Sequence, residues 1–101
     1  MPHEKSKAQH DLDRTEILRF LNEGGMLPVT PRSILIYMDE SLRSVSEESI
    51  EFSLRYMRDR FWVEIGEEKV VGKPPMIRWA RITATGVDEL DRRLAAMGET
   101  R

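Results

Sequence analysis

The feature that most constrains this chain is the order of its apolar patterns between Thr30 and Leu94. Apolar residues repeat at helical spacing in two successive segments, alternate in two short segments, and then return to helical spacing. This order predicts helix, turn, helix, two-stranded hairpin and helix. At 101 residues, the chain is long enough for one such domain with a modest core.

Helix-capping residues place the boundaries of the first two helical segments. A first helix is expected to start near Asp13 and to end at Gly24-Gly25, which leaves residues 1–12 as a flexible polar arm. Thr30-Pro31 begins a second helix that should reach about Leu42, because proline at the first helical position sacrifices no hydrogen bond. The buried side of this helix should include some of Ile34, Leu35, Met38 and Leu42.

A third helix, capped by Ser46 and running to about residue 60, should follow a short turn. Residues 62–65 then alternate like a half-buried strand, residues 66–75 are rich in turn formers, and residues 76–82 form a second strand. Trp62 and Trp79 are expected to pack within this hairpin or its core. The core stripe of the third helix should consist of Ile50, Leu54, Met57 and Phe61.

Thr83 is expected to cap a final helix with a narrow apolar stripe. That stripe consists of Val87, Leu90, Leu94 and Met97, at the a/d spacing of a coiled coil. It either closes the chain's own core or, together with the first helix, forms a homodimer interface, which is the interpretation we favour. The domain would then cover residues 13–97 of an α+β protein, with residues 98–101 as a tail.

Composition narrows the classes of function. Cysteine is absent, and His3 and His10 lie in the expected arm without an acidic cluster, so no metal site is expected. The sequence contains neither GxxxxGK[ST] nor GxGxxG, and nothing in it indicates catalysis or a cofactor. No apolar run approaches the length of a membrane span or signal peptide, so we expect a cytoplasmic protein with no membrane partner.

Two stretches resemble the winged helix-turn-helix transcription regulators of bacteria and archaea. The first is Val45-Ser46-x-x-x-Ile50-x-x-x-Leu54-x-x-Met57-x-x-x-Phe61-Trp62-Val63, a capped recognition helix that leads directly into the first wing strand. The second is Ile82-Thr83-Ala84-Thr85-Gly86-x-x-x-Leu90, which looks like the Leu-Thr-x-x-Gly signature at the end of the wing. The resemblance covers roughly residues 13–97, and the chain is also similar, more faintly, to small winged-helix proteins of Mu-like phages.

The resemblance implies a three-helix core, a two-stranded β-wing and a C-terminal helix. It also implies that the chain binds double-stranded DNA as a small transcription regulator. One departure from the family pattern stands out: most members have a glycine just before the first wing strand, where this chain has Arg60-Phe61-Trp62.

In such a protein the third helix would enter the major groove, and the wing, at about residues 66–76, would lie along the DNA backbone. Because the net charge is only −2, binding would have to come from a local basic patch. The candidate DNA contacts, chosen as hydrogen-bond donors or cations, are Arg32, Ser49, Ser53, Arg55, Arg58, Lys69 and Lys73.

The third helix also carries features that favour a different function. Glu47, Glu48 and Glu51 are acidic where a phosphate backbone would pass, although acids in a first turn also complement the helix dipole. Phe52 and Tyr56, one turn apart, either pack under the wing or against the second helix, or form an exposed aromatic pair for a protein partner. The alternative is therefore a winged-helix protein–protein interaction module, in a phage or accessory assembly, that does not bind DNA.

Overall fold

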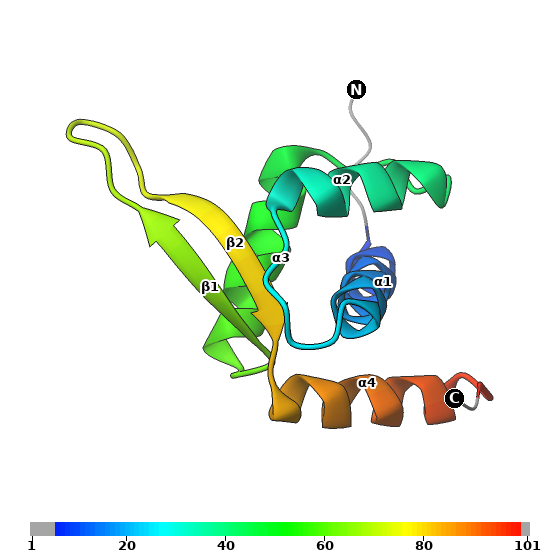
Figure 1. The fold of residues 1–101 in the computed structure, drawn as a ribbon. Coiled ribbons are helices and arrows are strands. Elements are labelled where there is room, and N and C mark those ends of the chain that lie inside the picture. The colour runs from blue at the N-terminus through cyan, green and yellow to red at the C-terminus, as the bar shows by residue number, and fades with distance from the viewer. Residues whose placement is uncertain (1–5, 100–101) are drawn as a thin grey trace.

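Four helices pack together beside a two-stranded antiparallel hairpin, in the order predicted from the sequence (Figure 1). The computed structural model describes residues 6–99. The predicted α+β winged helix-turn-helix plan is confirmed. The elements are α1 (Lys7–Glu23), α2 (Pro31–Glu40), α3 (Glu47–Asp59), β1 (Val63–Glu68), β2 (Met76–Ile82) and α4 (Ala84–Ala96).

The first helix begins six residues earlier than the sequence prediction placed it. Ser6 accepts a hydrogen bond from the backbone N–H of Gln9, and the Gln9 side chain accepts one from the backbone N–H of Ser6. This reciprocal capping box satisfies two donors that would otherwise lack a partner, and it starts the helix at Lys7. The prediction of a flexible arm is therefore wrong for residues 7–12, and residues 1–5 lie outside the described residues.

The ends of α2 and α3 share an uncommon backbone feature. Leu42 and Phe61 follow these helices with φ values of 59° and 65°, in the left-handed region that glycine usually occupies. After α3, the N–H of Trp62 donates to the Met57 carbonyl and the N–H of Phe61 donates to the Arg58 carbonyl. This is the Schellman pattern, built here with a phenylalanine at the position that glycine usually occupies.

The left-handed turns also correct two core assignments. Leu42 and Phe61 were expected to be buried, but they are 95% and 75% exposed. A left-handed residue leaves the helical path, so its side chain no longer continues the apolar stripe of the preceding turns. Leu35 is only partly buried, and the core contributions of α2 come mainly from Ile34 and Met38.

The core lies where the helices meet the inner face of the hairpin. All four helices and both strands contribute to it, which explains why the α4 stripe faces inward. Its buried members are Ile17, Leu18, Leu21, Ile34, Met38, Ile50, Leu54, Met57, Val63, Ile77, Ala80, Ile82, Leu90 and Leu94.

The hairpin is longer than predicted and is bent near its middle. β1 continues to Glu68, and Trp62 precedes the strand instead of lying on it. The register shifts between Gly66 and Glu67, which is where a bulge bends the wing. The Trp79 indole covers Gly66 so closely that a Cβ there would lie 1.9 Å from the indole Nε1, so the predicted packing role of Trp79 is confirmed.

Two contacts fix the hairpin and α4 against the helices. Val29 and Ala80 exchange backbone hydrogen bonds of 2.8 Å, so the link before α2 covers the outer edge of β2. At the start of α4, Thr83 caps the helix by accepting from the Gly86 N–H, as predicted. A Cβ on Gly86 would lie 2.0 Å from the Trp62 carbonyl oxygen, so only glycine allows this close approach.

A buried arginine joins the two terminal helices. Arg93 of α4 donates to the backbone carbonyl of Asp11, to Thr15 and to the carboxylate of Glu89. A further ion pair of 2.9 Å links Arg93 to the Asp11 carboxylate. These contacts satisfy a guanidinium that is almost fully buried, and they hold α4 against α1.

Candidate nucleic-acid interface

The predicted interface consists of the outer face of α3 and the wing that follows it. Ser46 caps α3 by accepting a hydrogen bond from the Ser49 N–H, as predicted. The inner face of α3 is fixed by its buried residues Ile50, Leu54 and Met57. The side chains at 48, 52 and 59 therefore point outward, and those at 55 and 58 turn toward the wing. The start of this outer face is acidic and exposed, as the sequence indicated.

Two arginines of α3 are held by one wing glutamate. Arg55 Nη1 lies 2.7 Å from Glu67 Oε2, and Arg58 Nη1 lies 3.3 Å from Glu67 Oε1. Arg55 also donates to the backbone carbonyl of Pro75 at 3.0 Å, across the base of the wing loop. The hydrogen bond from Arg55 lowers the pKa of Glu67, and the charges of Arg55, Arg58 and Lys69 add to this effect.

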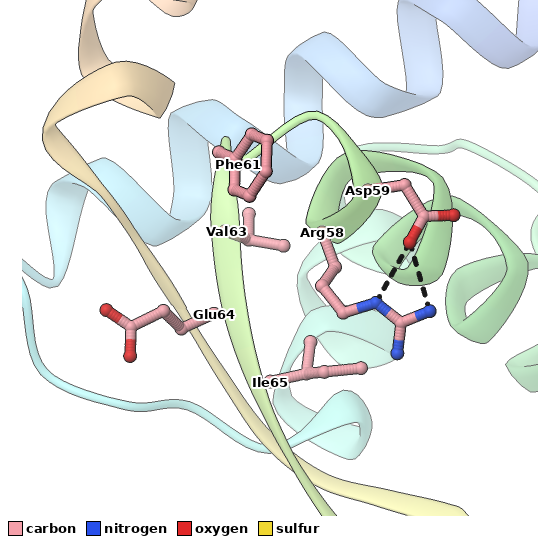
Figure 2. Close-up of a pocket in the computed structure, with 6 residues that line it drawn as sticks. All are labelled: Arg58, Asp59, Phe61, Val63, Glu64 and Ile65. Atoms are coloured by element: carbon pink, nitrogen blue, oxygen red, sulfur yellow. Dashed lines mark hydrogen bonds and ion pairs between the residues drawn. The ribbon is translucent and has the colours of Figure 1, made fainter.

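This arrangement, which we call the Glu67 clamp (Arg55, Arg58 and Glu67), was not anticipated from the sequence. The two arginines were predicted to face DNA, whereas here they tie the recognition helix to the wing. Figure 2 shows the end of α3, where Arg58 also folds back onto the carboxylate of Asp59 at 3.1 Å. Beside this pair, between the end of α3 and β1, lies a pocket of about 660 Å³. Figure 2 labels the residues that line it.

Neither predicted serine contact stands out as an exposed donor. Ser53 is buried in the interior, so its assignment as a DNA contact is wrong. Ser53 lies beside the stripe of Ile50, Leu54 and Met57, and the buried side of the helix is wide enough to include it. The apolar stripe alone did not show that width. Ser49 is half-buried, and its backbone N–H is taken by the cap of the helix.

Arg32 and the wing lysines are the exposed cations among the predicted contacts. Arg32 lies in the first turn of α2, and its guanidinium is 3.6 Å from Glu47 at the start of α3. Lys69 and Lys73 are exposed in the loop that joins the two strands. Figure 1 shows that this loop projects away from the helical body. The wing tip is thus the part of the predicted patch that is free to contact a ligand.

The two aromatic residues of α3 have separate environments. Phe52 is 61% exposed on the outer face of the helix. Tyr56 is half-buried, packs against the core, and contacts Trp62 at a ring-centroid distance of 6.2 Å. The two do not form an exposed aromatic pair, and only Phe52 is available to a partner.

The predicted dimer stripe on α4 is mostly internal. Leu90 and Leu94 are buried in the chain's own core, so they cannot also contact a second copy. Val87 is partly buried against the same core, whereas Met97 is 47% exposed at the end of the helix. The a/d spacing reflects packing on α1 and the hairpin, and only Met97 of this stripe is well exposed.

Within residues 6–99, no group of three or more His, Asp or Glu side chains is arranged to hold a metal ion. No helix in the same range is long and apolar enough to cross a membrane.

No protein-family model and no curated protein matches the sequence. Several solved structures match the fold, and three of them illustrate the similarity. The transcriptional regulator TA0346 from Thermoplasma acidophilum is similar at a TM-score of 0.73 and 20% identity, over 92% of this chain and 86% of that chain. A PadR-like transcription factor from Bacteroides fragilis follows at a TM-score of 0.67 and 16% identity, over 90% and 84% of the two chains.

A PadR-family transcriptional regulator from Eggerthella lenta is similar at a TM-score of 0.63 and 15% identity, over 87% of this chain and 77% of that chain. The three matches cover between 87% and 92% of this chain. At such low identities they establish the winged-helix fold, and the DNA contacts of this chain have to be argued from its own residues.

Proposed function

We propose that this protein is a small DNA-binding transcription regulator that places α3 in the major groove and the wing tip on the backbone. The observation that carries the proposal is the projecting wing, whose loop carries the exposed Lys69 and Lys73. Each lysine that neutralises a phosphate releases a counterion, and that release supplies most of the non-specific affinity for DNA. The similarity to three proteins described as transcriptional regulators supports this proposal.

The Glu67 clamp defines how the recognition helix would engage DNA. Arg55 and Arg58 are both within ion-pair distance of one carboxylate, so each can exchange that carboxylate for a DNA phosphate at little cost. Arg32 can do the same, because its partner Glu47 lies 3.6 Å away at an exposed position. These three arginines would therefore add phosphate contacts after the wing lysines have docked.

The acidic start of α3 limits this affinity. Glu47 and Glu48 are exposed in the first turn, where they stabilise the helix by about 0.3–1 kcal/mol each through its dipole. Near a polyanion the same charges are repulsive. We therefore expect modest non-specific affinity and a strong dependence on salt.

Binding to a labelled mixed-sequence duplex, measured by fluorescence anisotropy at about 50 mM salt, tests the proposal. We expect wild-type protein to bind, and the double variant Lys69→Ala, Lys73→Ala to bind at least about tenfold more weakly. Arg92→Ala is the control, because Arg92 is an exposed cation on α4, away from the wing. Absence of binding at tens of micromolar protein would overturn the proposal and leave exposed Phe52 as the reason to seek a protein partner.

We also propose that the protein acts as a homodimer through α1 and α4, in the cytoplasm. The two helices pack together, and each has an exposed apolar residue: Leu12 is 44% exposed and Met97 is 47% exposed. A two-fold dimer would present two recognition helices about 34 Å apart, one turn of DNA. Light scattering should give twice the chain mass for wild type and the chain mass for Leu12→Glu, whereas Leu27→Glu, on the exposed link before α2, should remain a dimer.

A further inference from the structure

A second cavity lies on the flank of α3 that faces away from the wing. It has a volume of about 750 Å³ and is enclosed by the first two turns of α1 and the second half of α3. Because successive residues of a helix differ by 100°, Tyr56 and Arg60 point to this side whereas Arg55 and Arg58 point to the wing. The residues of this cavity that matter here are Lys7, His10, Arg14, Phe52, Tyr56 and Arg60.

Two arginines sandwich the tyrosine in this cavity. The Cζ atoms of Arg14 and Arg60 lie 3.7 and 3.6 Å from the centroid of the Tyr56 ring. Two guanidinium groups cannot share one face of a ring at these distances, so they occupy opposite faces. Stacking covers the flat surface of each guanidinium but leaves free the N–H groups at its edge, which lie in its plane. One of these, the Nη1–H of Arg60, already donates to the Tyr56 backbone carbonyl at 3.5 Å, and the remaining N–H groups of Arg60 can meet an acceptor.

The Arg14 side chain has one unused donor, its Nε–H, in a buried position. Its residue is only 9% exposed, and its Nε has no hydrogen-bond partner among the described residues. The Nδ1 of His10, one turn earlier on α1, is also buried without a partner there. Buried polar groups are nearly always hydrogen-bonded, and a buried charged donor without an acceptor is costly. An acceptor that enters the cavity would remove that cost.

The charge of the cavity selects the kind of acceptor. Lys7, Arg14 and Arg60 are cationic, and Asp11 is the acid that lines the same space. The Asp11 carboxylate is already engaged by Arg93 at 2.9 Å, outside the Arg14–Tyr56–Arg60 stack. Three cations with one pre-engaged acid create a positive site, and guanidinium groups bind phosphate oxygens with paired N–H donors.

We propose that this cavity is a binding site for a phosphate group, held by Arg14, Arg60 and Lys7 beside Tyr56. Phosphate fits better than a single carboxylate, because its several oxygens can accept from donors that approach from α1 and from α3 at once. The group can belong to a free phosphorylated molecule or to a nucleic-acid backbone. The site needs no wing residue, so it stands independently of the DNA contacts proposed for Lys69 and Lys73.

Titration with inorganic pyrophosphate, followed by NMR of the backbone amides and arginine Nε–H groups, tests the site. We expect saturable shifts at Arg14, Arg60 and neighbouring residues of α1 and α3. Arg14→Met and Arg60→Met should each weaken binding about tenfold, the effect of losing one charge-assisted hydrogen bond. Arg92→Met, which removes an exposed cation from α4, should leave the binding curve unchanged.

Using both Arg14→Met and Arg60→Met keeps the test decisive even if one variant does not fold. Should Arg14→Met fail to fold, Arg60→Met still decides the matter, because Arg60 is exposed. Shifts that are absent, non-saturable to tens of millimolar, or equally large at Lys69 and Lys73 would overturn the proposal. Saturable shifts that persist unchanged in Arg14→Met and Arg60→Met, as they should in the control Arg92→Met, would also overturn the proposal.

A competition arm separates the two sources of the phosphate. Duplex DNA that displaces pyrophosphate from wild-type protein assigns the site to the nucleic-acid backbone. Pyrophosphate that stays bound when DNA is added assigns it to a free phosphorylated ligand. Failure of all DNA binding, with the pyrophosphate shifts intact, refutes the proposed regulator function and leaves the phosphate site standing.

Discussion

Replacing Leu42 by glycine should stabilise the protein, although it removes a leucine. Leu42 follows α2 with φ at 59°, and its side chain is 95% exposed, so almost no buried apolar area is lost. A residue with a Cβ in the left-handed region costs about 1–2 kcal/mol. Glycine has more conformational entropy in the unfolded chain than leucine, and this offsets about 0.4–1 kcal/mol of the stability gained by relieving the strain. The expected net increase in the free energy of unfolding is therefore about 0.5–1 kcal/mol.

Urea denaturation followed by circular dichroism measures this difference, and thermal melts should show a rise of roughly 2–8 °C in Tm. Leu42→Ala is the matched control, because alanine removes the side chain but keeps the Cβ. It should remain within about 0.5 kcal/mol of wild type. A glycine variant that is less stable than wild type, or an alanine variant that gains as much as glycine, would refute the argument from backbone strain.

Three further substitutions probe other contacts. Gly86→Ala should destabilise by about 2–3 kcal/mol, because its Cβ would meet the backbone oxygen of Trp62 at 2.0 Å; a smaller loss in urea denaturation would mean that the helix can shift. The hydrogen bond from the Arg92 guanidinium lowers the pKa of Glu89 in the folded protein below its usual value of 4.5. The ionised Glu89 carboxylate therefore stabilises the fold above pH 4.5, and this stabilisation is lost as the pH falls through the lower pKa of the folded state. Glu89→Gln should therefore flatten the decline of stability below pH 4.5, and an unchanged decline would contradict this. Glu67→Gln should release the wing from α3 and raise amide hydrogen exchange in β1, and unchanged exchange would show that the clamp does not hold the wing.

The starts of three helices could be predicted because they depend on local chemistry. Thr30, Ser46 and Thr83 each accept a hydrogen bond from the N–H three residues later, as their sequence positions indicated. The start of α1 was missed although a signal was present: Ser6 and Gln9 have the spacing of a capping box. The residues after Gln9 are mostly polar, so no apolar period marked this part of the helix. Asp13 and Arg14 are buried there nevertheless, which an apolar pattern cannot reveal.

The ends of α2 and α3 could not be predicted in the same way. Their left-handed residues are Leu42 and Phe61, and neither residue type favours that conformation. What the structure shows at these positions is hydrogen bonding that closes each turn, joined after α3 by a distant bond from the Thr83 hydroxyl to the Phe61 carbonyl. The sequence showed that Arg60-Phe61-Trp62 precedes β1 without a glycine, but it did not show that Phe61 adopts the left-handed conformation.

The candidate site was only partly predictable for a related reason. The exposure of Lys69 and Lys73 follows from their place in a turn-rich loop. The pairing of Arg55 and Arg58 with Glu67 depends on how β1 lies against α3 at the register shift after Gly66, which no local sequence pattern indicates. The stack of Tyr56 between two arginines likewise joins residues of α1 and α3 that share no local pattern.

The salt dependence of duplex binding tests the central claim most directly. The slope of log Kobs against log salt reports the number of phosphates that the protein neutralises, at about 0.9 per contact on B-DNA. For a wing that grips the backbone, Lys73→Ala should reduce the slope by about one unit, and Arg92→Ala on α4 should leave it unchanged. Equal slopes for wild type and Lys73→Ala would contradict a DNA-binding wing.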